Sequence, residues 1–276
     1  MLDKDLIPQA HLWSMALLIA ERFIDAMFFP PVGSDDIIYR RLTLDPAAPS
    51  HLKAIEDAIY DNQLLLNPFR SISVAVDSNL FVVLPSELDS DLATIAPEAI
   101  KLASGLTEIP SDEVTVASVS APDTAVCSMI PSTLAGFLRR TFYNVELTHP
   151  LAPIAAWLPG CDTPEGVIVA SLRDDSRLDI VASRGGRLLL ANSFSFEALP
   201  DAAWYIMAVR SSLPVAPSAS IRLAAEPSVR QELARIISLA APGAPAPEAV
   251  PLPASLWQAG SAVASAPLSL TLKSTL

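Results

Sequence analysis

Residues 167–191 read VIVASLRDDSRLDIVASRGGRLLLA, and this stretch decides the fold. Its apolar runs are separated by Arg173-Asp174-Asp175 and by Ser183-Arg184-Gly185-Gly186, which predicts three consecutive strands over 167–172, 177–182 and 187–191. The Gly-Gly pair adopts positive φ angles without steric cost, as a tight hairpin turn requires. The segment is therefore expected to fold as an antiparallel meander.

The first 45 residues repeat this order, with strands expected over 12–20, 23–29 and 37–44. A helix, a strand and a second helix then follow in both halves of the chain, without recognisable residue identity between the halves. The other expected elements are helices from Ser50, over 91–104, from Pro131, over 150–158, from Pro200 and from a capping box at Ser228-Val229-Arg230-Gln231, and strands over 71–76, 80–84, 113–119, 124–130 and 220–223. This repetition predicts two similar lobes.

A cluster of turn residues at 159–166 marks the expected border between the lobes. It gives a first lobe over 1–160, a second over 161–242 and an Ala/Pro-rich tail over 243–276. Glu248 is the only charge between Arg235 and Lys273, and prolines recur from residue 242 to residue 253. Because proline prevents a regular helix, two interpretations stay open for the tail. It begins as an extended linker or packs on the second lobe, with one more short strand or helix around 254–264.

Composition excludes several classes of protein. The 276 residues carry 30 Asp+Glu against 18 Lys+Arg, a net charge of −12, so neither nucleic acid nor an anionic membrane is expected as a partner. The apolar run over 12–20 is too short to span a bilayer, and the acidic residues before it do not resemble a secretory signal. A cytoplasmic protein without membrane insertion is expected. Two cysteines, Cys127 and Cys161, are too few for a disulfide framework.

Motifs for catalysis are missing from the sequence, which contains no Walker A pattern, no G-x-S-x-G, no H-E-x-x-H and no G-x-G-x-x-G. His11, His51 and His149 lie far apart, and each has an ordinary place at a chain end or beside a helix. Trp204 and Tyr205 sit at a spacing that is more often found in a core than in a pocket. No catalytic residue and no metal site is therefore assigned.

Three strands, a helix, a strand and a helix form the order of the ribonuclease H-like unit, and a duplicated unit of this kind resembles actin, Hsp70 and the sugar kinases. The chain more specifically resembles a bacterial family of uncharacterised proteins, a domain of unknown function with an actin-like ATPase fold. The motifs that carry this resemblance are Asn67-Pro68-Phe69, Val74 to Asn79, Val82 to Leu88, Ile130-Pro131, His149, Arg177 to Val181, Arg187 to Phe194 and Phe196 to Ile206. The resemblance implies an α/β protein with two ribonuclease H-like lobes, whose mixed five-stranded sheets are flanked by helices. It brings no established activity.

An actin-like ATPase holds its nucleotide between the lobes, and the hairpin between the first two strands of each lobe approaches the phosphates. Such a hairpin needs Gly for close backbone approach and Asp to hold Mg²⁺ or a metal-bound water. Here the first hairpin is Ala20-Glu21-Arg22-Phe23, and the second is Ser171 to Ser176; neither contains Gly. The residues that the resemblance places at the interlobe site are Glu21, Asp77, Ser171, Asp174, Asp175 and Ser176.

Three hypotheses follow for the function. The first is a non-catalytic binding or scaffold protein with an unknown protein partner or small ligand and no cofactor, because the phosphate hairpins are incomplete. The second is an ATPase or small-molecule kinase that holds ATP and Mg²⁺ in an atypical interlobe site with Asp77, Asp174 or Asp175. The third is a cytoplasmic adaptor of an envelope or secretion assembly, in which the tail serves as a tether.

Overall fold

The computed structural model describes residues 7–31, 37–121, 123–161, 163–251 and 266–272. The chain divides into two compact units, and each is described by itself. The first unit comprises residues 1–84, 88–118 and 126–150, and the second comprises residues 85–87, 119–125 and 151–276. Among the described residues, no helix combines the length and the apolar character that crossing a membrane requires.

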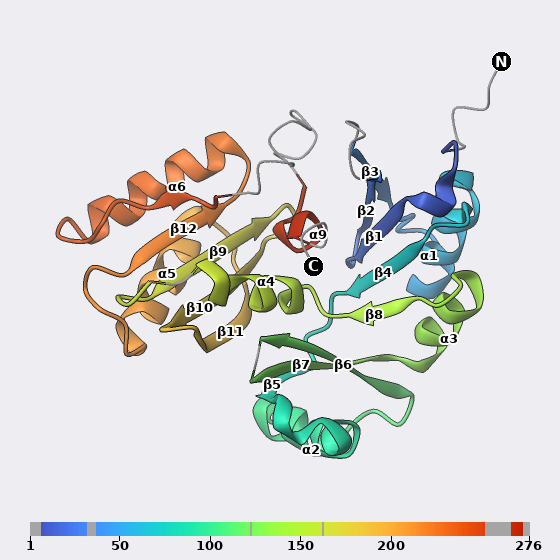
Figure 1. Ribbon diagram of the computed structural model, residues 1–276, viewed down its shortest axis with the longest axis horizontal. Coiled ribbons are helices and arrows are strands. Elements are labelled where there is room, and N and C mark those ends of the chain that lie inside the picture. Colours follow the sequence, from blue (N-terminus) through green and yellow to red (C-terminus); the bar gives the residue numbers. More distant parts are fainter. Residues whose placement is uncertain (1–6, 32–36, 122, 162, 252–265, 273–276) are drawn as a thin grey trace. The chain divides into compact units, whose positions relative to one another are not determined.

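The first unit is built on a five-stranded mixed sheet (Figure 1). Its strands, in the order in which they pair, are β3 (Ile38–Thr43), β2 (Phe23–Phe29), β1 (Ser14–Ile19), β4 (Ser71–Val76) and β8 (Glu146–Thr148). The pairs β1–β2 and β2–β3 are antiparallel, whereas β1–β4 and β4–β8 are parallel. The carboxyl ends of β1, β4 and β8 therefore meet at one edge of this sheet.

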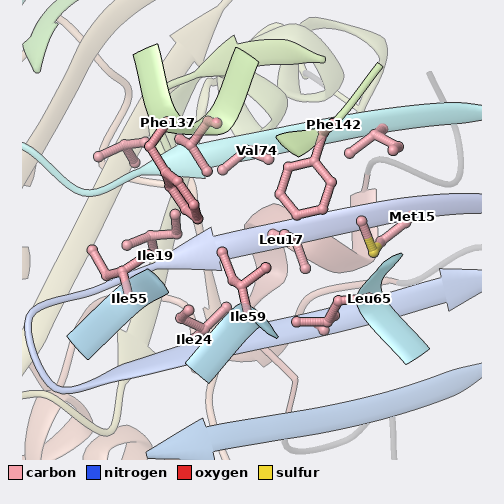
Figure 2. Packing of buried hydrophobic residues seen from close by; sticks show 14 of the residues in the cluster. Met15, Leu17, Ile19, Ile24, Ile55, Ile59, Leu65, Val74, Phe137 and Phe142 are labelled. Carbon is pink, nitrogen blue, oxygen red and sulfur yellow. The ribbon is translucent and has the colours of Figure 1, made fainter. Parts of the chain in front are cut away.

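Helices α1 (His51–Tyr60) and α3 (Ser132–Thr141), together with the 3₁₀ turns η1 (Ala10–Leu12) and η2 (Gln63–Leu66), belong to the same unit. Figure 2 shows how Ile55 and Ile59 from α1 and Phe137 from α3 pack against Leu17 and Val74 of the sheet. These side chains are almost fully buried. Each contributes roughly 1.5–3 kcal/mol through removal of apolar surface from water.

The residues between β4 and α3 in the sequence form a separate three-stranded sheet. It pairs in the order β5 (Phe81–Pro85), β7 (Thr124–Pro131) and β6 (Glu113–Ala121), and η3 (Ser86–Asp91) and α2 (Leu92–Ser104) connect β5 to β6. The strands expected over 80–84, 113–119 and 124–130 are thus confirmed. They form a sheet of their own and do not extend the five-stranded sheet.

The second unit repeats the five-stranded sheet. Its strands pair in the order β11 (Arg187–Ser195), β10 (Arg177–Arg184), β9 (Val167–Arg173), β12 (Ser220–Ala224) and β13 (Glu248–Ala249). Helices α5 (Leu199–Ser212) and α6 (Pro227–Ala240) share a buried cluster with this sheet. Also in this unit, α4 (Leu151–Trp157) contacts α9 (Leu268–Leu272), and η4 (Leu158–Cys161) follows α4.

Both sheets have the strand order third, second, first, fourth, fifth, which confirms the expected α/β fold of two ribonuclease H-like units with mixed five-stranded sheets. The expected border at residue 160 differs from the division of the structure. The long segment of the second unit begins at Leu151, where α4 packs against α9, β10 and β11.

Residues 248–249 pair in parallel with β12 as the fifth strand, so this part of the tail packs on the second lobe and is not a linker. Two local expectations were wrong. Helix α6 begins at Pro227, and the Glu226 side chain accepts hydrogen bonds from the Ser228 and Val229 N–H groups, so the capping box at Ser228 does not form. Trp204 is 65% exposed, because α5 buries Ala202, Ala203, Ile206 and Val209 instead. The element expected around 254–264 lies outside the described residues.

Candidate functional site

Backbone hydrogen bonds hold the turn between β1 and β2. The Ala20 N–H donates to the Phe23 carbonyl at 3.0 Å, and the Leu44 N–H donates to the Arg22 carbonyl at 2.9 Å. The side chains of Glu21 and Arg22 are exposed. Because the turn lacks Gly, its backbone cannot approach a phosphate as closely as the backbone of a glycine-containing hairpin does.

Asp77 follows the carboxyl end of β4. Its N–H donates to the Ile19 carbonyl at 2.9 Å, which extends the parallel pairing of β4 with β1 by one residue. The next residue, Ser78, donates its hydroxyl to the Met129 carbonyl at 2.7 Å and accepts from the Leu80 N–H at 3.1 Å. Glu21 and Asp77 therefore lie at the same edge of the first sheet, where open α/β sheets bind ligands.

His149 follows β8 at this edge, and it is buried. Its Nε2 lies 3.1 Å from the Ser78 carbonyl oxygen, and its ring stacks on Phe81 at 4.5 Å between centroids. A carbonyl oxygen only accepts hydrogen bonds, so Nε2 carries the proton of this pair. His149 lies just before α4 in the sequence, as expected, and it is a buried residue that holds the loop after β4.

The end of β9 and the turn that joins it to β10 contain four of the six predicted site residues, Ser171 in the strand and the other three in the turn. Asp174 and Ser176 are exposed, and Ser176 adopts a φ of 60° without being glycine. Ser171 is buried in β9 directly opposite Asp179. Asp175 turns inward, with 7% of its side chain exposed, and lies 3.4 Å from Nε of Arg173. The structure thus brings Asp175 to a cation and leaves Asp174 at the surface.

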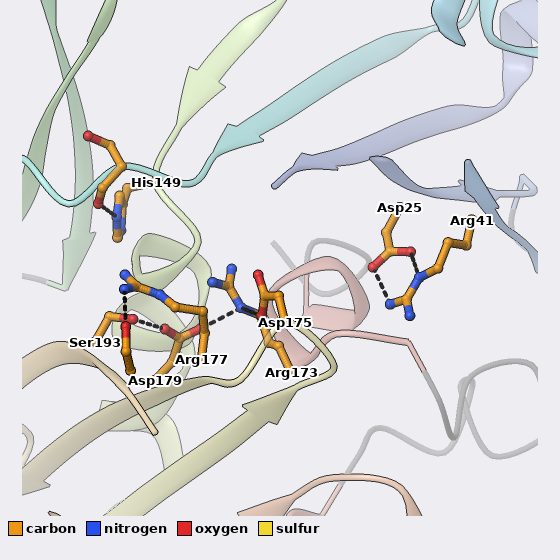
Figure 3. A network of polar contacts seen from close by, with 10 residues as sticks. Asp25, Arg41, His149, Arg173, Asp175, Arg177, Asp179 and Ser193 are labelled. Atoms are coloured by element: carbon orange, nitrogen blue, oxygen red, sulfur yellow. Dashed lines mark hydrogen bonds and ion pairs between the residues drawn. The ribbon is translucent and has the colours of Figure 1, made fainter. Parts of the chain in front are cut away.

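Arg173 is the centre of a buried polar cluster in the second unit (Figure 3). Its side chain is 1% exposed, and its Nε lies 3.8 Å from Oδ2 of Asp179. The Ser193 hydroxyl donates to Oδ1 of the same Asp179 at 2.7 Å, and Arg177 donates to the hydroxyl of Ser195 at 3.2 Å. Two carboxylates and one buried guanidinium therefore occupy the base of this hairpin.

The first unit has a corresponding buried aspartate, which the sequence analysis missed. Asp25 is fully buried and receives hydrogen bonds from Arg41 Nε at 2.7 Å, Arg41 Nη2 at 2.8 Å and the Tyr39 hydroxyl at 2.7 Å. The guanidinium of Arg41 also lies 4.2 Å from the ring centroid of Phe23. This is a bidentate ion pair with a cation–π contact, an arrangement that holds the carboxylate firmly.

Asp25 and Asp179 occupy the same place in the two units. Each is the third residue of the second strand, and each bonds to the side chain directly opposite on the third strand, Arg41 in one unit and Ser193 in the other. In the sequence, the sign of such a buried aspartate is a single acid within an apolar strand, as in FIDAMFF. The partners were not predictable without the register of the strands.

Neither cysteine provides a reactive thiolate. Burial raises the pKa of Cys127 to about 11 and also raises the pKa of Cys161. A thiol with a raised pKa stays protonated at neutral pH and is a poor nucleophile and metal ligand. Within the described part of the chain, no group of three or more His, Cys, Asp or Glu side chains is arranged to hold a metal ion.

The fold and these hairpins define the class: two ribonuclease H-like units of the actin-like ATPase fold. The chain belongs to the family described as "Protein of unknown function (DUF3822)", whose sequence profile matches residues 34–233. No curated protein sequence matches the chain.

Two solved structures are similar in fold. One is a Bacteroides thetaiotaomicron protein with an actin-like ATPase fold and unknown function, at 15% identity and a TM-score of 0.70, over 84% of this chain and 89% of that one. The other is a PilM–PilN type IV pilus biogenesis complex, at 13% identity and a TM-score of 0.52, over 98% of this chain and 100% of that one. At these identities the similarity establishes the fold alone.

ATP with Mg²⁺, the ligand that this fold class implies, does not fit the residues at either turn. The first turn lacks Gly and its one acid, Glu21, is exposed, and the second turn directs Asp175 toward the buried Arg173. Turning Asp175 away from Arg173 to hold Mg²⁺ weakens the compensation of a buried cation. No catalytic step through a nucleotide is therefore derived.

Proposed function

We propose that this protein is a non-catalytic member of the actin-like fold, which binds a partner protein and neither binds nor hydrolyses ATP with Mg²⁺. The observation that carries the proposal is Arg173, a buried cation at the hairpin where an actin-like ATPase binds phosphate and metal. The acids of this hairpin, Asp175 and Asp179, lie within 4 Å of its guanidinium.

The electrostatic cost of a metal ion at this place supports the proposal. Two unit charges about 4 Å apart interact by about 4 kcal/mol at an effective dielectric constant of about 20, and a divalent ion doubles that figure. A magnesium ion at Asp175 would be repelled by Arg173 to this extent. Arg173 therefore offsets part of the attraction that Asp175 and Asp179 would exert on a metal ion.

Partner binding is supported by analogy of fold. One chain with a similar fold belongs to a PilM–PilN complex of type IV pilus biogenesis, so this architecture occurs in an assembly with another protein. The proposal places the protein in the cytoplasm. Its two cysteines are free, as is usual for proteins of a reducing compartment.

Calorimetric titration of the full chain with ATP and Mg²⁺ tests the absence of a nucleotide site. We expect no Mg²⁺-dependent heat of binding, which corresponds to a dissociation constant weaker than ~1 mM. The exposed Asp174 provides the control, because Asp174→Ala leaves the buried cluster intact. Micromolar binding that requires Mg²⁺ and disappears in Asp174→Ala would show that the atypical ATPase or kinase hypothesis is right instead.

A further inference from the structure

Helix α9 is the last described element of the second unit, and its shape depends on its surroundings. It has five residues, Leu268–Leu272, and each of them is at most 3% exposed. At about 100° of rotation per residue, Leu268 and Leu272 lie on one side of the helix and Leu270 lies on the other. Isolated helices shorter than about 12 residues are not stable in water, so α9 is helical only while it is bound in its site.

The site that holds α9 is an apolar surface of α4 (Figure 1). Residues 151–155 of α4 are apolar and buried, and α4 also contacts β10 and β11. None of the five described residues of α9 belongs to the buried cluster that the sheet shares with α5 and α6. The main core of the second unit is therefore complete without α9, and we expect the helix to leave its site without unfolding that core.

One residue of α9 does not fit the apolar site. The Pro267 carbonyl accepts hydrogen bonds from the Leu270 and Thr271 N–H groups, both at 3.1 Å, and from the Thr271 hydroxyl at 3.0 Å. The Ser269 hydroxyl is also buried, but it has no hydrogen-bond partner among the described residues. A buried hydroxyl without a partner lowers the binding constant at least about fivefold, so an apolar side chain at this place would bind more tightly.

The length of chain before α9 decides what can replace the helix. Fourteen residues, 252–265, separate Pro251 from Ala266. A segment tethered by a connection of this length meets its own site at an effective concentration of roughly 1 mM. The α9 segment of a second copy, at micromolar concentration, therefore does not replace it. A segment of another protein does so when it binds roughly a thousandfold more tightly than α9.

We propose that this surface of α4 is the binding site for the partner protein and that α9 is its internal competitor. The partner inserts a short apolar helix, which carries an apolar residue in the place of Ser269, and α9 is released. This inference rests on the proposed function, because it names the class of partner and the way in which its binding is regulated. It does not involve the hairpin turns.

Hydrogen exchange of the full chain, measured by mass spectrometry with and without a synthetic peptide, tests the release of α9. The peptide has the sequence of residues 266–273 with Ser269→Ala. At millimolar concentration it should speed the exchange of the chain's own amides over 266–272 at least about fivefold, while α4 and β10 stay protected. The same peptide with Leu270→Asp added is the control, and it should have no effect because it brings a charge into an apolar site.

The variant Leu270→Asp of the full chain tests the site itself, because a charge at this buried place expels α9. The same Ser269→Ala peptide, carrying a fluorescent label, should bind this variant at least about tenfold more tightly than it binds the wild type, whose site is occupied. Leu239→Asp is the matched control, because Leu239 of α6 is 69% exposed, and it should bind the peptide as the wild type does. Circular dichroism should show that both variants are folded.

Three results overturn the proposal. A second unit that unfolds in Leu270→Asp shows that α9 is part of the core. A peptide that binds Leu270→Asp no more tightly than the wild type, or binds neither, shows that α9 covers no binding site. Exchange over 266–272 that stays unchanged at saturating peptide shows that α9 is not released. The titration with ATP and Mg²⁺ has its own outcome in each case, so this inference and the proposed function fail separately.

Discussion

Replacing Arg41 by leucine is expected to lower the free energy of unfolding by about 3–5 kcal/mol. The substitution leaves the carboxylate of Asp25 fully buried, without the bidentate hydrogen bonds at 2.7 and 2.8 Å that compensate its charge. The Tyr39 hydroxyl alone does not neutralise it. Urea unfolding of the full chain measures the loss, and hydrogen exchange with mass spectrometry should locate it in β1, β2 and β3.

The double variant Asp25→Val/Arg41→Leu separates the cost of an uncompensated charge from the value of the pair. Replacing a buried ion pair by apolar residues is often close to neutral, so most of the lost stability should return. A single variant that loses less than about 1 kcal/mol would contradict this account, because such a loss is typical of an exposed pair.

Replacing Arg173 by leucine is expected to have an effect of similar size, about 3–5 kcal/mol, in the second unit. Asp175 and Asp179, with 7% and 3% of their side chains exposed, would then share a buried site without the guanidinium between them. Like charges in such a site destabilise the folded state. Unfolding in urea should show the loss, and hydrogen exchange should report it in β9, β10 and β11.

The matched control is Arg184→Leu, because Arg184 lies at the far end of β10 and is exposed. Its removal should cost much less than the removal of Arg173. Adding Asp175→Asn and Asp179→Asn to Arg173→Leu removes both negative charges and should recover part of the lost stability. If the acid-to-amide changes deepen the loss instead, charge repulsion is not its cause.

The sequence predicted the long strands and the repeated order of elements, because period and turn residues are local signals. It did not predict β8 or β13, which have three and two residues and exist through parallel pairing with β4 and β12. Such short strands have too few residues for a period to be recognised. Their place is decided by the sheet that they join.

The site residues predicted from the sequence identified the two hairpins but not the side chains that pair within them. Composition showed that both hairpins lack Gly, but the pairing of Asp175 with Arg173 and of Asp25 with Arg41 depends on strand register and on burial. Trp204 was assigned to a core from its helical spacing, but α5 carries apolar residues around much of its circumference. Periodicity does not decide the orientation of such a helix.

The late position of β8 and β13 in the sequence affects how the protein folds during synthesis. The first sheet lacks its outer parallel strand until residue 148 has left the ribosome, and the second lacks its own until residue 249. At translation rates of roughly 5–20 residues per second, the 101 residues between these positions take about 5–20 s. The first sheet is therefore complete on the ribosome well before the second, and β9, β10 and β11 emerge long before the strand that completes their sheet.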